Sequence, residues 1–264
     1  MLAGLLAGAV DAAVLVHEGF DYDTGPLNNT PTSGVGQSGN WQLTPANTAN
    51  ATLSVADVAW NTPTGYSHRH NNKGVGGVQN ATGAFSLQQP INFDADGVYY
   101  FSLLYRRPVL EGNIGLLSLN SGETEKARLF QAVGGGNVTA RIGDELEGTG
   151  DAFSGTGDLL FVGRIQTSAS GNDTIAFQVI PASGTVPDTF TPTHTRTAET
   201  TGTADSLYFW NFLNEDSSGA YFGNFIMGST YGSVIMSIPE PTTILLVGLG
   251  VVLLSRLRRK STAS

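Results

Sequence analysis

Short apolar runs rich in aromatic and β-branched residues constrain this fold most. Glycine, asparagine, aspartate, serine or proline bounds each run, and no convincing amphipathic helix lies between them. Within 174–180, Ile175, Phe177 and Val179 alternate with more polar residues such as Gln178, as expected of a strand with one buried face. Many short strands joined by turns predict a β-sandwich or barrel. The clearest runs are 98–105, 114–119, 127–133, 137–142, 159–165, 174–180, 206–212 and 220–227.

Two stretches lack this strand pattern. Residues 27–80 are rich in glycine, asparagine and threonine, and predict long loops and short edge strands over one end of the sandwich. Residues 185–203 are rich in threonine and proline, and predict a mobile loop. The 264 residues suit one large all-β domain.

Composition excludes several function classes. The chain has 13 basic and 22 acidic residues, and four of the basic ones, Arg256, Arg258, Arg259 and Lys260, lie near its end. The rest is therefore strongly acidic and repels phosphates, so nucleic acid is not an expected partner. With no cysteine, the chain has no disulfide, thiol nucleophile or cysteine-bound metal.

Both ends carry apolar segments. Residues 1–13 resemble the hydrophobic part of a secretory signal with small residues at its end, although a basic start is missing. We expect a shortened signal peptide; the alternative is a buried first strand. At the other end, Thr242–Leu257 gives about 24 Å of helix, against about 30 Å for a hydrocarbon core. The basic residues that follow favour a short transmembrane helix with the bulk of the chain outside the cytoplasm.

The motif before this span indicates its use. Pro239, Glu240 and Pro241, the apolar run and the basic tip together resemble the PEP-CTERM sorting signal of bacteria, over 238–264. The resemblance implies exosortase as partner, with the three motif residues as its recognition site. It also implies an inner-membrane precursor that is processed and delivered to the cell surface or extracellular matrix. The alternative is a permanent C-terminal anchor with an accidental Pro-Glu-Pro.

A second resemblance covers 14–237. HEGFDYDTGPLNN, GQSGNW, LLFVGRIQTSASGNDTIAFQVIP and AYFGNFIMGSTYGSVI are similar to core segments of concanavalin A-like (LamG-like) domains. This resemblance implies a jelly-roll of two antiparallel sheets and often a carbohydrate-facing role. The acidic pair that the family commonly has in its last strand is missing from 223–229.

Catalytic patterns are weak. Glycosidases of this fold need two carboxylates across a groove, and no such motif occurs here. The acidic cluster at 143–148 lies among glycines and is typical of a solvated turn. We therefore expect no enzyme, with a glycan hydrolase or lyase as the alternative.

Binding residues have equally plain structural alternatives. Asp94 and Asp96 could ligate calcium, the ion best suited here, or form an ordinary turn before 98–105. His68 and His70 would share a strand face and could hold a metal, but no third ligand is evident. Trp41, Trp60 and Tyr66 could form a sugar-binding platform or belong to the core. We expect a structural or adhesive surface protein with weak binding to exopolysaccharide.

Overall fold

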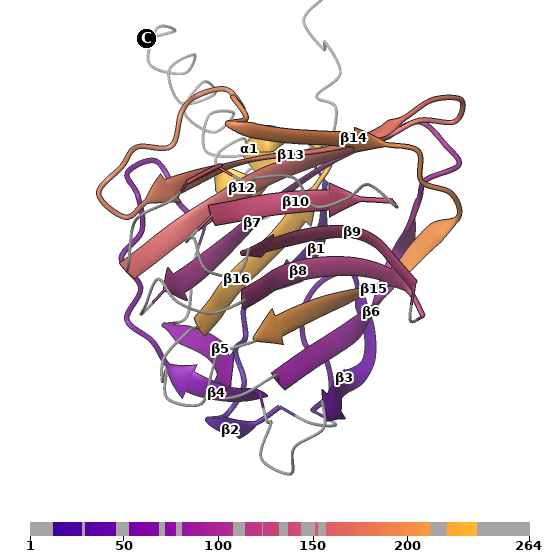
Figure 1. Cartoon of the computed structure of the whole chain (residues 1–264). Coiled ribbons are helices and arrows are strands. Elements are labelled where there is room, and N and C mark those ends of the chain that lie inside the picture. Colours follow the sequence, from indigo (N-terminus) through magenta and orange to yellow (C-terminus); the bar gives the residue numbers. More distant parts are fainter. Residues whose placement is uncertain are drawn as a thin grey trace, which may run out of the picture.

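The computed structural model contains two antiparallel β-sheets packed face to face (Figure 1). In Figure 1 the smaller sheet lies in front, and the helix lies behind the larger sheet. The structure describes residues 13–27, 30–45, 53–68, 72–77, 81–107, 114–122, 124–131, 137–143, 151–152, 157–211 and 221–236.

The larger sheet has nine strands in the order β14-β13-β12-β7-β16-β5-β4-β2, and β1 also pairs with β16. All of these pairings are antiparallel. Its strands are β1 (Val14–Glu18), β2 (Gly25–Pro26), β4 (Leu53–Asp57), β5 (Lys73–Gly77), β7 (Gly97–Arg107), β12 (Gly157–Thr167), β13 (Asp173–Pro181), β14 (His194–Ala198) and β16 (Tyr221–Gly228).

The smaller sheet has seven strands in the order β11-β10-β9-β8-β15-β6-β3. Its strands are β3 (Gln37–Pro45), β6 (Ala81–Asn92), β8 (Ile114–Ser121), β9 (Thr124–Gln131), β10 (Asn137–Ile142), β11 (Asp151–Ala152) and β15 (Thr203–Asn211). One short helix, α1 (Tyr231–Ile235), follows β16. The prediction of an all-β sandwich is therefore confirmed.

The eight apolar runs fall in β7, β8, β9, β10, β12, β13, β15 and β16. Two other predictions were wrong in part. Residues 185–203 include β14, whose alternating threonines pair with the free edge of β13. Within 27–80, β4 and β5 lie inside the larger sheet rather than at its edge. Glycine-rich β5 shows no apolar alternation, because its backbone supplies the pairing and its small residues leave room for a covering side chain.

Aromatic side chains fill the space between the sheets. Trp41 of β3 meets Phe85 of β6, with ring centroids 5.0 Å apart, and Phe209 of β15 at 5.9 Å. Phe222 of the opposite sheet lies 5.6 Å from Phe209, so the contact crosses the sandwich. Such buried rings dominate the apolar area that stabilises the fold.

A second apolar cluster covers part of the outer face of the larger sheet. The segment after β4 lays Trp60 against this face, and α1 adds Val234 and Ile235. Gly223 of β16 makes this approach possible, because a Cβ there would lie 2.5 Å from the Trp60 ring. The same cluster includes Leu160 and Val162 of β12 and Ile180 of β13.

Candidate functional site

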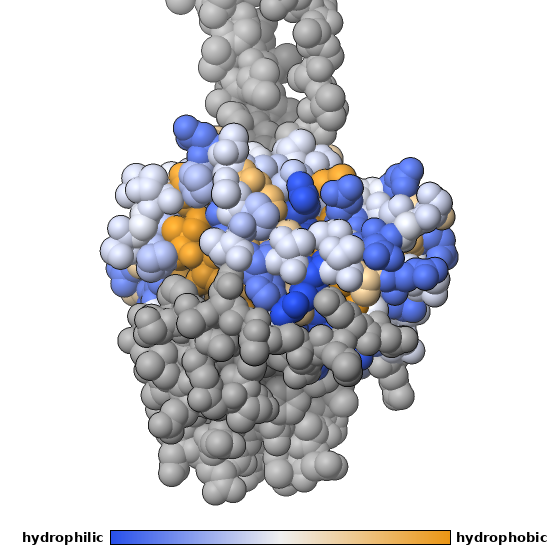
Figure 2. All heavy atoms as spheres, turned by 45° about the horizontal axis from the view of Figure 1, so that its top comes forward, coloured by the Kyte–Doolittle hydropathy of each residue, from blue (hydrophilic) through white to orange (hydrophobic). Residues whose placement is uncertain are grey.

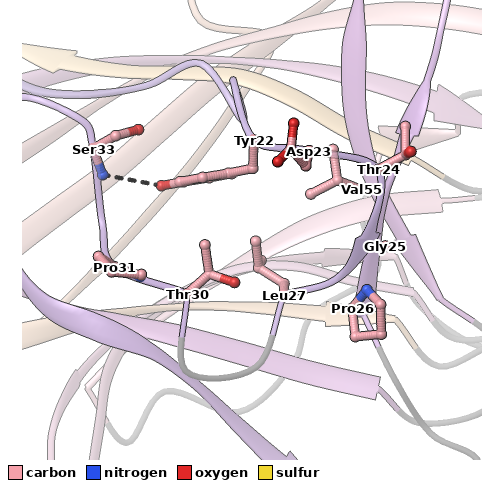
Figure 3. Close-up of a pocket in the computed structure, with 10 residues that line it drawn as sticks. All are labelled: Tyr22, Asp23, Thr24, Gly25, Pro26, Leu27, Thr30, Pro31, Ser33 and Val55. Atoms are coloured by element: carbon pink, nitrogen blue, oxygen red, sulfur yellow. Dashed lines mark hydrogen bonds between the residues drawn. The ribbon is translucent and has the colours of Figure 1, made fainter.

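A pocket of about 410 Å³ opens beside the edge strand β2, where the chain crosses from β1 toward β3. Figure 3 shows its side chains arranged around a central space, with Tyr22 and Asp23 on one side. Its lining residues are Tyr22, Asp23, Thr24, Gly25, Pro26, Leu27, Thr30, Pro31, Ser33 and Val55. Buried Leu27 and Val55 contribute apolar surface, and threonine hydroxyls and one carboxylate contribute polar groups.

Tyr22 is held rigidly at the wall of this pocket. Its hydroxyl donates to a Glu18 carboxylate oxygen at 2.7 Å. The same hydroxyl oxygen accepts hydrogen bonds from Trp41 Nε1 at 3.1 Å and from the Ser33 backbone N–H at 3.2 Å. The Ser33 bond appears in Figure 3. Three partners fix the ring, so the wall is preorganised for a ligand.

Glu18 lies behind this wall and is fully buried. Burial raises the pKa of its carboxyl, while hydrogen bonds from Tyr22 and the backbone of Phe20 act in the opposite direction. The Phe20 N–H donates to Glu18 at 2.6 Å. Phe20 has a φ of 54°, a left-handed turn that reverses the chain directly after β1. Glu18 therefore positions the wall and does not line the pocket.

The lining of the pocket suits a small polar ligand. A half-buried aromatic ring, the hydroxyls of Thr24, Thr30 and Ser33, and an exposed carboxylate can contact the apolar face and hydroxyl groups of a sugar. Asp23 is the only carboxylate among the lining residues, so the pocket does not offer the two facing carboxylates of a glycosidase.

The structure buries the three aromatic residues considered for sugar binding and places Trp41 in a different cluster from Trp60 and Tyr66. Trp41 is 0% exposed in the core, and Trp60 and Tyr66 are 7% and 8% exposed under the outer-face cluster. Trp60 donates its Nε1–H to the Lys73 carbonyl, and the Arg106 guanidinium lies 5.4 Å from its ring. Their burial corresponds to the core alternative. The sequence signal for the pocket was instead the polar stretch DYDTGP between two strands.

Tyr66 belongs to a polar network beside α1. Asn224, with a φ of 45°, donates its amide Nδ2–H to the Tyr66 hydroxyl at 2.7 Å. Its amide oxygen accepts from His17 Nε2 at 2.9 Å. His68 donates its Nε2–H to the Ser233 carbonyl at 3.0 Å, and burial lowers its pKa to about 4. His68 thus lies near His17, with ring centroids 6.3 Å apart.

His70, the partner considered for His68, lies outside the described residues. Asp94 and Asp96 hold two different loops: Asp94 accepts the Gly202 N–H at 3.0 Å, and Asp96 accepts the Ala169 N–H at 3.0 Å. These bonds correspond to the turn alternative. Among the residues that the structure describes, no three histidine, aspartate or glutamate side chains gather as metal ligands. Calcium binding stays a prediction.

The sorting residues Pro239, Glu240 and Pro241, the span 242–257 and the basic tip also lie outside the described residues. In the described part of the chain, no helix is long and apolar enough to span a membrane.

Comparison with known families identifies the C-terminal segment. Residues 237–260 match the family described as the PEP-CTERM protein-sorting motif. The expected sorting signal is confirmed: it marks an exported protein and is the recognition signal of exosortase. No curated protein sequence matches the chain.

Several solved structures are weakly similar to this chain at low identity. A Trypanosoma rangeli sialidase mutant with trans-sialidase activity matches 76% of this chain at 12% identity and TM-score 0.36. This chain spans only 31% of that sialidase. Arcelin-5, a lectin-like defence protein of Phaseolus vulgaris, matches at 8% identity and TM-score 0.39, covering 72% of this chain and 98% of its own. Domain 4 of the Geobacillus stearothermophilus arabinanase AbnA matches at 13% identity and TM-score 0.40, and the match covers 83% of this chain and 93% of that domain. Likenesses this weak bear on none of the chemistry of this chain.

Proposed function

We propose that this exported protein is delivered by exosortase to the cell surface or extracellular matrix, where the sandwich has a structural or adhesive role. The sorting motif at 237–260 carries this proposal. Before processing, the span Thr242–Leu257 holds the precursor in the inner membrane, with Arg256, Arg258, Arg259 and Lys260 on the cytoplasmic side. Removal of the tail then frees the domain.

Weak carbohydrate binding is the molecular activity that we assign to the domain. The Tyr22 pocket supports it, because a fixed aromatic wall stands beside hydroxyls and the Asp23 carboxylate. The surface also suits a hydrated polymer. In Figure 2 the coloured part of the surface is mainly hydrophilic, with an apolar patch at its left. Val35, Val98 and Met236 are the exposed large apolar residues of the described part. No enzymatic step is assigned.

Processing is tested by the intact mass and location of the mature protein in its native host, with and without exosortase. We expect loss of the segment after the Pro-Glu-Pro motif only when exosortase is present. Replacement of Pro239, Glu240 and Pro241 by alanine should prevent this cleavage, so the protein should keep the mass of the uncut precursor. A tail that stays uncut and membrane-bound in both strains would contradict sorting and support permanent anchoring.

The pocket is tested with the mature protein purified from that host and a panel of neutral oligosaccharides. Asp23→Asn removes the charge at nearly constant size, so affinity should fall by about 5-fold to 30-fold, as for a lost charged hydrogen bond. Asp205→Asn, an exposed aspartate of β15, is the matched control and should bind normally. Equal binding by all three proteins would remove the pocket from the proposal. Release of new sugar ends during incubation would instead support a hydrolase or lyase.

A further inference from the structure

On the outer face of the larger sheet, partly exposed side chains border the second apolar cluster, and Tyr100, Phe190 and Tyr231 pack against it. Side chains of neighbouring strands lie side by side there, because Arg164 of β12 is in register with Tyr100 of β7 and with Ala176 of β13. The next row joins Val98, Gln166 and Thr174 in the same way. Val98 and Gln166 are exposed, and Arg164 and Tyr100 are half-buried.

Three aromatic rings border this area. Tyr100 contacts Phe190 edge to face at 5.8 Å, and Tyr231 of α1 lies 6.2 Å from Tyr100 and 5.9 Å from Phe190. The Tyr231 hydroxyl donates to the Pro187 carbonyl at 2.9 Å. Segments distant in sequence therefore build one half-exposed aromatic surface, which we call the aromatic shelf: Tyr100, Phe190 and Tyr231. Its rings can lie against the apolar face of a sugar.

Arg164 is the cation of this shelf. Its guanidinium carbon lies 5.7 Å from the centre of the Phe190 ring. Its Nε is buried without a hydrogen-bond partner, and none of the ion pairs among the described residues includes it. Arg106, on the same face, contrasts with it, because Asp158 binds both its Nε and its Nη2. The buried Nε is out of reach of a ligand, so only the terminal nitrogens of this guanidinium can donate to an external acceptor.

Charge decides which ligand fits. The rows around Arg164 present glutamine, threonine, tyrosine, valine and alanine. Two acidic groups lie around the shelf: Asp188, whose charge acts on Tyr231, and Asp96, two residues before Val98, which accepts the Ala169 N–H. A planar carboxylate matches the fork of a guanidinium. Because the chain is acidic overall, with 22 acidic against 13 basic residues, the rest of its surface repels any polyanion, so the attraction for a carboxylate has to come from Arg164 itself.

We infer that the aromatic shelf and Arg164 form a second glycan site, specific for carboxylated (uronic acid) polysaccharide. It lies on the outer sheet face and shares no residue with the Tyr22 pocket. The inference rests on the proposed function in one respect, that the domain meets polysaccharide outside the cell.

The test uses the mature protein, a galacturonic acid hexamer, and the same hexamer with its carboxyls methyl-esterified. Isothermal titration should show at least about 5-fold tighter binding of the free acid, since charged hydrogen bonds exceed neutral ones by this order. Arg164→Gln should remove that preference, and Arg164→Lys should keep part of it.

Controls separate this site from the pocket and from misfolding. Arg141→Gln, which removes a half-buried arginine of β10 in the other sheet, should bind the acid normally. Phe190→Leu keeps an apolar side chain but removes the ring, and it should weaken the binding of both hexamers. Equal affinity for acid and ester, or no effect of Arg164→Gln in a protein with an unchanged unfolding midpoint, would overturn the inference. If Asp23→Asn abolishes binding of the acid and Arg164→Gln does not, the inference is overturned, and the proposal for the Tyr22 pocket stands. Absence of any glycan binding would count against both sites.

Discussion

Single residues on the outer sheet face are held by partners distant in sequence. His68 shows this best, because its imidazole bonds the backbone of α1 from a loop 165 positions earlier. Burial lowers its pKa from 6.5 to about 4, and the neighbouring His17 acts in the same direction. The neutral ring is therefore favoured in the folded chain.

This shift predicts how stability changes with pH. Above pH 6.5 His68 is neutral in both states; as pH falls toward 4, the unfolded chain takes up its proton first, and stability is lost across that window. In urea unfolding between pH 7 and 4.5, His68→Gln should reduce this loss by about 1–2 kcal/mol, after allowance for solvent screening of a partly exposed group. His194→Gln is the control for removing an imidazole elsewhere. An identical pH dependence of wild type and His68→Gln would contradict the assignment.

Among the elements, α1 is unusual because it is too short to be stable by itself. Its five residues begin with a capping box, in which the Thr230 side chain accepts the Ser233 N–H. The Val234 carbonyl accepts a hydrogen bond from Ser102 Oγ at 2.6 Å. The Ile235 carbonyl accepts one from the Ser67 N–H at 3.0 Å. Tertiary contacts therefore hold the helix on the sheet.

Two substitutions within α1 test this dependence. Val234 is 0% exposed, so Val234→Ala should lower the free energy of unfolding by about 1–3 kcal/mol through lost packing. Gly232 is exposed with open space at its Cβ position, so Gly232→Ala should be neutral or stabilise by up to about 1 kcal/mol. Urea unfolding followed by tryptophan fluorescence measures both. A cost for Gly232→Ala equal to that of Val234→Ala would show that burial does not hold the helix.

At the scale of the whole molecule, the first and last described segments lie together. The Ala13 N–H donates to the Ser229 hydroxyl at 3.2 Å, and the Ser229 N–H donates to the Ala13 carbonyl at 3.1 Å. Beside them, β1 pairs with β16, and α1 follows within three residues. The sorting motif begins directly after Met236, so the domain's connection to the processing signal starts from the covered outer face.

The sequence by itself determined the all-β class, the main strands and the sorting motif. These are local properties. Alternation within 174–180 indicates a strand, although the face with Gln178 is buried too, under the second apolar cluster, and not exposed as expected. Pro239-Glu240-Pro241 with its apolar run needs no tertiary partner to be recognised. The motif was predicted and then confirmed by the family match, whereas Trp41, Trp60 and Tyr66 could not be assigned to surface or core.

Only the tertiary structure decided where side chains meet. The pocket joins residues that precede and follow the edge strand β2 in the sequence. The aromatic shelf joins Tyr100 of β7, Phe190 of the loop before β14, and Tyr231 of α1. Strand order and sheet packing create such neighbours, and neither is encoded in the spacing of residues along the chain. For the same physical reason, the glycine-rich strand β5 and the threonine-rich strand β14 could not be predicted from their own residues. Pairing with β16 and β13, respectively, makes them strands.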